Sequence, residues 1–379
     1  ITLSTTSNQR TGSGDIRLLA GDNLSLGGLA QTSGSFSATA ESGWIRDADS
    51  DGSVDVEADG LRLDAAVGIG RLGDDVNPIE TTVATLSGQA GTEGISVLES
   101  DALTVGETTV TVGRVGSDAG VSDLTDAAQS DLITQDGSDG SIVLRTADGS
   151  ITLEDGTAPD DEGAIFADGS GNVLVEAAGS AADVVANADV VSETGNVTIL
   201  AATDVNFGNG ADVSSLGAGS IDLEATTGAI DLGVTSDQNA GSGDIRLLAA
   251  TNITLGGTAS TTGSVSATAQ SGWIRDADAD GSVDVEADGL RLDAGIGIGQ
   301  LGGDVNPIET TVDTLSGRAG AEGINVLESD GLMVGDVGAT VSRVASDATV
   351  SGLTDADQSD LITAEGSHGA IVLRVTDGN

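Results

Sequence analysis

A short alternation of apolar and polar residues recurs along the chain. Apolar residues at every second position predict strands with one buried face, because successive side chains of a strand point to opposite sides. The clearest examples lie 24 residues apart: "GNVLVEA" from Gly171, "GNVTILA" from Gly195, "GSIDLEA" from Gly219 and "GDIRLLA" from Gly243. The side chains expected in the core are Val173, Val175 and Ala177 of the first strand and Ile221, Leu223 and Ala225 of the third.

Each of these strands belongs to a coil of about 18 to 31 residues, in which a shorter strand follows, as in "GAIDLG" from Gly228 and "TNITLGG" from Thr251. A coil this short cannot bury its apolar side chains alone, so equivalent strands are expected to stack in parallel. The sequence therefore predicts an all-β fold, a parallel β-helix (β-solenoid), right-handed by the usual handedness of such crossovers. A string of β-sandwich domains is the alternative, but it predicts polar or Pro-rich linkers, and the sequence has none.

A longer repeat contains the coils. Residues 1–150 align without a gap with residues 230–379, and 108 of these 150 pairs are identical. We interpret residues 1–229 as a first long repeat of about ten coils and residues 230–379 as a partial second repeat in one continuous solenoid. We also expect the chain to be a segment of a longer polypeptide.

Composition agrees with a thin, layered core. The chain has 379 residues, 38% of them hydrophobic, with two Trp, three Phe and no Tyr, so the core must consist of Val, Ile, Leu and Ala. Its 57 Gly and three Pro favour many turns and uninterrupted strand pairing. No stretch approaches the roughly 18 apolar residues of a membrane span, so membrane insertion is not expected.

Charge excludes several classes of partner. There are 61 acidic and 13 basic residues, all of the latter Arg, and the net charge is −48. Nucleic acids and anionic lipids require positive charge, so neither is an expected partner. The chain also has no Cys, which excludes disulfides and thiolate metal sites. Its surface should instead attract cations.

Several segments resemble the repetitive body of giant bacterial exoproteins. They are "GSGDIRLLAATNITLGG" at 241–257, "LRLDAGIGIGQLGGDVNPIETTVDTLSG" at 290–317 and "GINVLESDGLMVG" at 323–335. This repeat style is similar to that of filamentous haemagglutinin-like adhesins. The resemblance implies an extracellular or surface-displayed β-helix that serves as an adhesin stalk, matrix fibre or cell-surface filament.

An acidic loop occurs once in each long repeat, as "WIRDADSDGSVDVEADG" from Trp44 and with one substitution from Trp273. Oxygen ligands at positions 1, 3, 5, 7 and 9 of a loop, with Gly at 6, are typical of calcium sites. The candidate Ca²⁺ ligands are Asp47, Asp49, Asp51, Ser53 and Asp55 in the first loop, and Asp276, Asp278, Asp280, Ser282 and Asp284 in the second.

The loop departs from the calcium pattern at position 12, which is Ala58. If a strand begins at Gly52, Val54, Val56 and Ala58 point into the core and Asp55 points outward. A carboxylate from an adjacent coil could then complete the ligand set. The alternative is a solvated acidic turn that binds no ion.

Two classes of function remain open. The first is a structural, non-enzymatic segment of an extracellular fibre, stalk or adhesin, which gives reach and stiffness and self-associates. The alternative is a β-helix carbohydrate-active enzyme or glycan-binding module. Trp44 and Trp273 are candidates for stacking on sugars, or they pack at the corners of the coils. Surface glycans and neighbouring or host cells are the expected partners beyond the protein itself.

Overall fold

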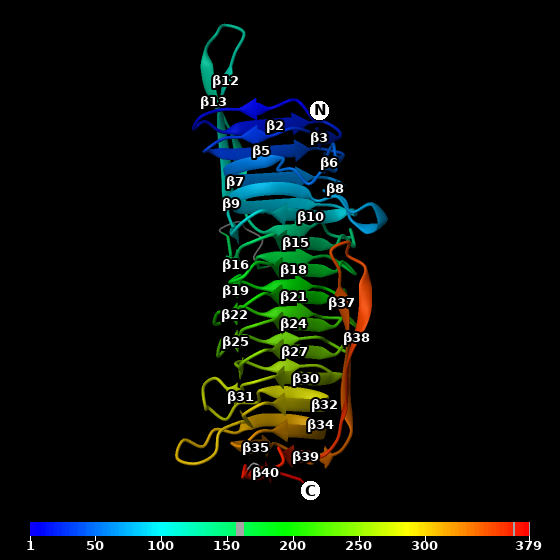
Figure 1. Ribbon diagram of the computed structural model, residues 1–379. Coiled ribbons are helices and arrows are strands. Elements are labelled where there is room, and N and C mark those ends of the chain that lie inside the picture. Colours follow the sequence, from blue (N-terminus) through cyan, green and yellow to red (C-terminus); the bar gives the residue numbers. More distant parts are fainter. Residues whose placement is uncertain (157–162, 367, 379) are drawn as a thin grey trace. The chain divides into compact units, whose positions relative to one another are not determined.

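The computed structural model describes residues 1–156, 163–366 and 368–378. Within these ranges the regular structure consists of strands and one short 3₁₀ turn, η1 (Gly73–Asp75). The chain forms two compact units: unit 1 comprises Ile1–Gly179 and Ala345–Thr349, and unit 2 comprises Ser180–Val344 and Val350–Asn379. In both units the strands of successive coils pair in parallel, which confirms the predicted parallel β-helix (Figure 1).

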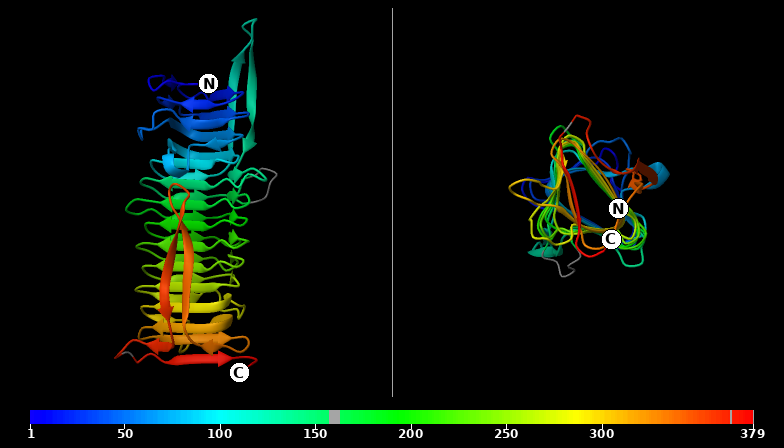
Figure 2. Two further views of the ribbon diagram at one scale, coloured as in Figure 1. Left: turned by 90° about the vertical axis from the view of Figure 1, so that its right-hand side faces the viewer. Right: turned by 90° about the horizontal axis from the view of Figure 1, so that it is seen from below.

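Unit 1 is built from three-sided coils (Figure 2). Side 1 stacks β2 (Ile16–Ala20), β5 (Ser35–Ala40), β7 (Val56–Ala65) and β9 (Ile79–Ala90). Side 2 stacks β3 (Leu24–Leu26), β6 (Trp44–Asp47), β8 (Gly68–Ile69), β10 (Gly94–Glu99), β15 (Ile142–Thr146) and β18 (Val173–Ala177). Side 3 stacks β1 (Gln9–Arg10), β4 (Ala30–Gln31) and the first halves of β7 and β9. The shorter strands β11 (Leu103–Val105), β14 (Leu132–Thr134), β16 (Ile151–Leu153) and β17 (Ile165–Ala167) continue the stack.

Unit 2 repeats the same arrangement. Side 1 contains β21 (Val197–Ala201), β24 (Ile221–Ala225), β27 (Ile245–Ala249), β30 (Ser264–Ala269), β32 (Val285–Ala294) and β34 (Ile308–Ala319), followed by β36 (Met333–Val334) and β39 (Leu361–Thr363). Side 2 contains β19 (Val184–Ala186), β22 (Val205–Phe207), β25 (Ile230–Leu232), β28 (Ile253–Leu255), β31 (Trp273–Asp276), β33 (Gly297–Ile298), β35 (Gly323–Glu328) and β40 (Ile371–Val375). Side 3 contains β20 (Val190–Ser192), β23 (Val213–Ser215), β26 (Gln238–Asn239) and β29 (Ala259–Ser260).

Aliphatic ladders fill the interior of each unit. In unit 2, the register pairs Val197 with Ile221 and Ile221 with Ile245, which confirms the 24-residue period. All three are fully buried. The six residues predicted in the core from the repeat pattern, listed above for β18 and β24, are also buried. Stacked parallel strands thus place like side chains directly above one another, so a continuous apolar core forms without large aromatic residues.

Two antiparallel hairpins leave the coils, which the repeat pattern did not predict. In unit 1 the hairpin consists of β12 (Thr108–Val115) and β13 (Val121–Gln129), and in unit 2 of β37 (Val337–Val344) and β38 (Val350–Gln358). The hairpin lengthens its coil: Ile95 of β10 pairs with Ile142 of β15, 47 residues later. The expected upper limit of about 31 residues per coil is therefore wrong at this coil.

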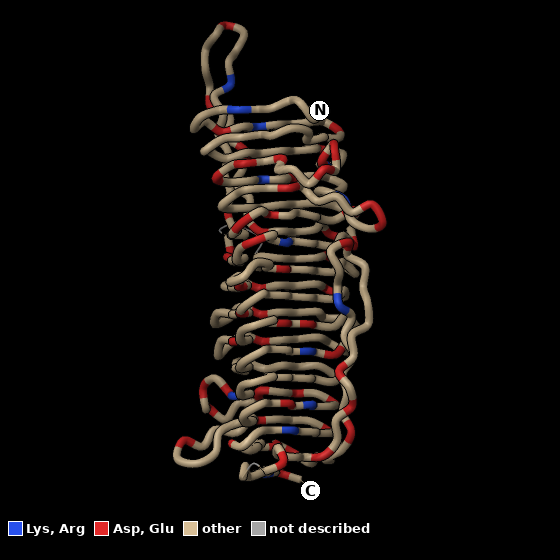
Figure 3. The backbone as a smooth tube through the Cα atoms, viewed as in Figure 1, with Lys and Arg blue, Asp and Glu red and all other residues tan. Residues whose placement is uncertain are grey.

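The boundary between the long repeats lies inside unit 2. β25, which starts at Ile230, pairs with β22 on one side and β28 on the other, so the coil stack crosses the boundary without interruption. That all coils form one continuous solenoid stays a prediction. Acidic residues lie along the coils and corners of both units, with the few arginines scattered among them (Figure 3).

Candidate cation site

The acidic corner connects two coils of unit 1. β6 ends at Asp47, and β7 starts at Val56, directly after Asp55. Because Val56 pairs with Thr81 of β9, Asp55 lies beside Glu80 of the next coil. The Asp55 amide donates to the Glu80 carbonyl oxygen at 2.9 Å, and the Glu80 amide donates to Asp55 Oδ2 at 3.2 Å. The backbone thereby joins an acid of one coil to an acid of the next.

The predicted orientation of Asp55 is wrong. The strand begins at Val56 rather than Gly52, whose φ of 73° keeps the chain in a turn. Val56 is buried as expected, but Val54 and Ala58 are only half-buried. Asp55 is 3% exposed, because the corner turns its side chain toward the neighbouring coil instead of outward.

Asp47 shapes the corner. Its Oδ1 accepts the Asp49 amide at 3.0 Å, and its Oδ2 accepts the Ser50 amide at 2.6 Å. These bonds hold Ser50 at a positive φ of 52°, which is uncommon for a residue other than glycine. Asp47 Oδ2 also accepts Asn77 Nδ2 at 3.1 Å, so the side chain is held in position from two segments of the chain.

Asp47, Asp55 and Glu80 form a compact carboxylate cluster. One oxygen from each lies within 4.8 Å of the others, and the side chains are 8%, 3% and 6% exposed, respectively. Glu80 Oε2 is buried without a hydrogen-bond partner. Glu99 of β10 is also buried, yet its Oε2 accepts Thr81 Oγ1 at 2.6 Å and the Val83 amide at 3.0 Å. Glu80 Oε2 therefore needs a proton or a cation as its partner, since buried polar atoms are normally bonded.

Burial and mutual repulsion perturb the acids of the cluster. Loss of solvation, followed by the negative charge of Asp47, raises the pKa of Asp55 to about 9 and that of Glu80 to about 7. At neutral pH such groups either keep a proton or share a cation, because ionised carboxylates at this separation repel one another strongly. The cluster is thus a site for positive charge.

The second long repeat builds the same cluster in unit 2. Oxygens of Asp276, Asp284 and Glu309 lie within 4.8 Å of one another, and the three residues are buried. Burial raises the pKa of Asp284 to about 9 and also raises the pKa of Glu309. Glu309 Oε2, like its counterpart in unit 1, is buried without a hydrogen-bond partner. As in the first loop, Asp276 Oδ1 accepts the amide of Asp278 at 3.0 Å.

No family model, curated protein or solved structure matches this chain. Among the described residues, no helix is long and apolar enough to span a membrane.

The other predicted ligands surround the cluster instead of joining it. In unit 1, Asp49, Asp51 and Ser53 line a hollow of about 430 Å³, together with Asp55 of the cluster. Asp51 is exposed, and the Ser53 amide donates to its Oδ1 at 2.8 Å, which lowers the pKa of Asp51. The corresponding hollow of unit 2, about 310 Å³, is lined by all five predicted residues: Asp276, Asp278, Asp280, Ser282 and Asp284. Positions 3, 5 and 7 of each loop thus form an acidic approach to the buried acids.

Sequence reasoning missed Glu80 and Glu309 as candidate ligands. Each follows "NPI" at the start of a strand, where a buried residue is expected to be apolar. The acid at this position was the one feature of the sequence that could have marked each glutamate as a candidate ligand. Its partner could not be read from the chain, because Glu80 and Asp55 are 25 residues apart and meet only through the strand register.

The tryptophans beside the loops are occupied by intramolecular contacts. The Arg46 guanidinium lies 4.5 Å from the centre of the Trp44 ring, and Arg275 lies 4.0 Å from that of Trp273. These cation–π contacts support corner packing as the role of both rings. In each case the arginine covers one face of the ring, and stacking on a sugar would also require a ring face.

Proposed function

We propose that this chain is a structural segment of an extracellular bacterial fibre, stalk or adhesin, whose coils are stabilised by calcium. Stacked parallel ladders in each unit supply stiffness, because every coil is hydrogen-bonded to its neighbours along the backbone. A strongly acidic surface suits surroundings rich in salt and divalent ions. Absence of enzymatic activity and binding to surface glycans or cells stay predictions.

The observation that carries the calcium proposal is the buried, unbonded oxygen of Glu80 and of Glu309. Each of these glutamates belongs to a cluster with two further buried carboxylates. Carboxylate and carbonyl oxygens with water are the ligands that Ca²⁺ prefers, usually six to eight in number. In unit 1, Asp47, Asp55 and Glu80 would supply the carboxylates and the acidic hollow would supply access for the ion.

A bound ion would tie consecutive coils together. Asp47 and Asp55 flank one corner, whereas Glu80 belongs to the coil that stacks on it. Two like charges 4 Å apart repel by about 4 kcal/mol at an effective dielectric constant near 20. Calcium would replace this repulsion with attraction to all three carboxylates, and so stiffen the stack.

Thermal unfolding with calcium and with a chelator tests the proposal. At a calcium concentration about 100-fold above Kd, each site should stabilise the folded chain by about 2.7 kcal/mol, so Tm should rise. Isothermal titration should find one ion for each cluster. The double variant Glu80→Gln, Glu309→Gln should lose the calcium-dependent shift, because each site loses one charged ligand.

The matched control is Glu99→Gln with Glu328→Gln. These glutamates are also fully buried, but they lie outside both clusters and accept hydrogen bonds from Thr81 and Thr310. The control variant should lower Tm and still respond to calcium. Identical melting curves with calcium and with chelator for the unmodified chain would rule out the calcium sites.

A further inference from the structure

Each hairpin has a near half, which contains Asp126 or Asp355, and a far half next to the turn. The near halves of both hairpins are anchored to their coils in the same way. In unit 1, Asp126 accepts Arg17 Nε at 2.7 Å and Ser37 Oγ at 2.8 Å. In unit 2, the equivalent Asp355 accepts Arg246 Nε at 3.1 Å and Ser266 Oγ at 2.7 Å. Both hairpins also carry the same irregularity near the start of the first strand. They are therefore the same element, built twice.

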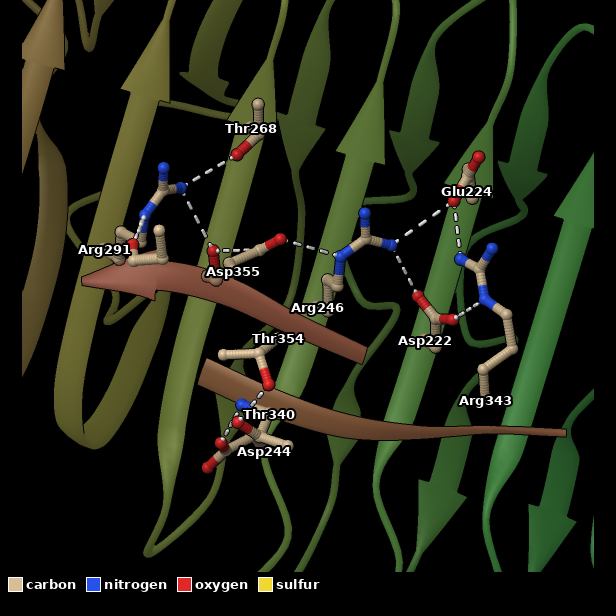
Figure 4. Close-up of polar contacts among 12 residues, drawn as sticks. Asp222, Glu224, Asp244, Arg246, Thr268, Arg291, Thr340, Arg343, Thr354 and Asp355 are labelled. Carbon is tan, nitrogen blue, oxygen red and sulfur yellow. Dashed lines mark hydrogen bonds and ion pairs between the residues drawn. The ribbon is translucent and has the colours of Figure 1, made fainter. Parts of the chain in front are cut away.

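The far half of the unit 2 hairpin lies on two further coils. Arg343 donates to Asp222 Oδ2 at 2.6 Å and to Glu224 Oε2 at 2.5 Å (Figure 4). The Val344 amide donates to Thr198 Oγ1 at 2.9 Å. Val344 is 1% exposed. An ion-paired arginine, an amide-to-hydroxyl hydrogen bond and the burial of Val344 together fix this half of the hairpin to β21 and β24.

The Ser342 amide completes this set of contacts. It donates to Ser220 Oγ at 2.7 Å. Asp222 is fully buried, and its carboxylate forms ion pairs with Arg343 of the hairpin and Arg246 of β27. The surface that binds the far half of the hairpin thus has three features. They are Thr198 on one coil and, on the next coil, Ser220 and the acid pair Asp222 and Glu224.

The far half of the unit 1 hairpin carries the matching residues without a partner surface. It extends past the first coils of its unit (Figures 1 and 2). Arg114 corresponds to Arg343 at the 229-residue offset, yet within the described part of the chain it makes no ion pair. Val115 corresponds to Val344 and is 67% exposed. The same docking strand is present, but its apolar and charged groups face solvent.

We propose that the far half of β12–β13 docks on another run of coils of this same repeat, one that carries the equivalents of Thr198, Ser220, Asp222 and Glu224. Charge selects this occupant, because Arg114 needs an acid pair and the unit 2 coils show such a pair in contact with the same residue type. Shape selects it as well, because Val115 then fills the place that Val344 fills in unit 2. The hairpin would act as a clamp that joins one run of coils to the next. This inference does not depend on the calcium sites.

Cysteine labelling of the 379-residue chain tests which residues hold the unit 2 hairpin on its coils. The native chain has no Cys, so each introduced Cys is the only thiol. A Val344→Cys probe should react with a thiol reagent at least about tenfold more slowly than a Val115→Cys probe, as burial hinders thiol reactivity. Adding Arg343→Glu should bring the rate at position 344 close to that at position 115. The matched change, Arg114→Glu, should leave the rate at position 115 unaltered. Continued protection of position 344 in the Arg343→Glu variant would refute the role of the arginine.

A chain extended by a second copy of residues 180–229 in front of Ile1 tests the docking itself. This extension supplies the coils that the unit 2 hairpin covers, at the same offset from β12–β13. The Val115→Cys probe should become protected by at least about tenfold, and Arg114→Glu should restore its reactivity. An unchanged labelling rate in the extended chain would overturn the proposal. Labelling reports the hairpin alone, so either result is independent of the response to calcium.

Discussion

The carboxylates of Asp47, Asp55 and Glu80 repel one another in a site that is almost closed to water. The sequence made Asp47 and Asp55 candidates, because acids at alternating positions of a loop are typical of calcium sites. It could not supply Glu80, since only the pairing of β7 with β9 brings this residue to the corner. It also misplaced Asp55, because the turn at Gly52 delays the start of the strand. Residue spacing thus predicts which groups could bind an ion, and strand register decides which of them meet.

The raised pKa values predict how stability depends on pH. An acid whose pKa is higher in the folded chain than in the unfolded chain binds more protons when folded, so protonation favours folding. This contribution is complete below the unfolded pKa of about 4 and is lost as pH rises through the folded pKa. For Glu80 the folded pKa is about 7, and for Asp55 and Asp284 it is about 9.

In a chelator, Tm should therefore fall as pH is raised from about 5 to about 8. Excess calcium should remove most of this fall, because the ion replaces the protons. Differential scanning calorimetry over this pH range measures both effects. The Glu80→Gln, Glu309→Gln variant should show a flatter profile, and a chelated native chain whose Tm rises over the same range would contradict the interpretation of the clusters.

At the scale of elements, the stacked strands of the coils can be predicted from the sequence, whereas the hairpins cannot. The 24-residue recurrence predicted β18, β21, β24 and β27 because each coil repeats the same inward positions. The hairpin strands also alternate apolar and polar residues, but alternation does not reveal whether a strand pairs in parallel with the next coil or antiparallel with its neighbour. The contacts of the hairpins with distant coils could not be predicted either, because they depend on how the hairpin strands pair.

Arg246 joins these two kinds of element. It lies on β27, is 6% exposed, and pairs with Asp222 of β24 at 2.9 Å and with Asp355 of the hairpin at 3.1 Å. Replacing it with leucine should lower the free energy of unfolding by about 3 kcal/mol, because buried acids lose a partner. Urea unfolding measures the change.

Arg17 provides the matched comparison in unit 1. It pairs with Asp126 at 2.7 Å and is more exposed than Arg246. Arg17→Leu should lower the free energy of unfolding by only about 1.5 kcal/mol, because one acid, rather than three, loses its arginine. Equal losses for the two variants would mean that the buried acid Asp222 does not depend on Arg246.

At the scale of the whole molecule, charge opposes the association that a fibre requires. A net charge of −48 makes neighbouring chains repel, and the acids are spread over the coils of both units (Figure 3). Screening by salt shortens this repulsion: the Debye length falls from about 30 Å at 0.01 M to about 10 Å at 0.1 M ionic strength. Self-association should therefore depend strongly on salt.

Sedimentation velocity over this range of NaCl, with chelator present, should show larger assemblies as salt increases, because the repulsion is screened. Electron microscopy of the same samples should show elongated assemblies. The chelator separates screening from ion binding. Compact, monodisperse particles at every salt concentration would contradict the fibre proposal.

The seating of β37–β38 has a consequence for the order in which unit 2 folds. Its Val344 amide bonds to Thr198, 146 residues earlier in the chain, and Arg343 reaches back 121 residues to Asp222. Contacts between residues so far apart form slowly, because a long loop must close before they contribute. The coils that carry Thr198 and Asp222 must therefore be formed before the hairpin can settle on them, and in synthesis from the N-terminus they emerge first. We therefore expect the hairpin to settle only after these coils have formed, and its release to be an early step when the molecule is unfolded.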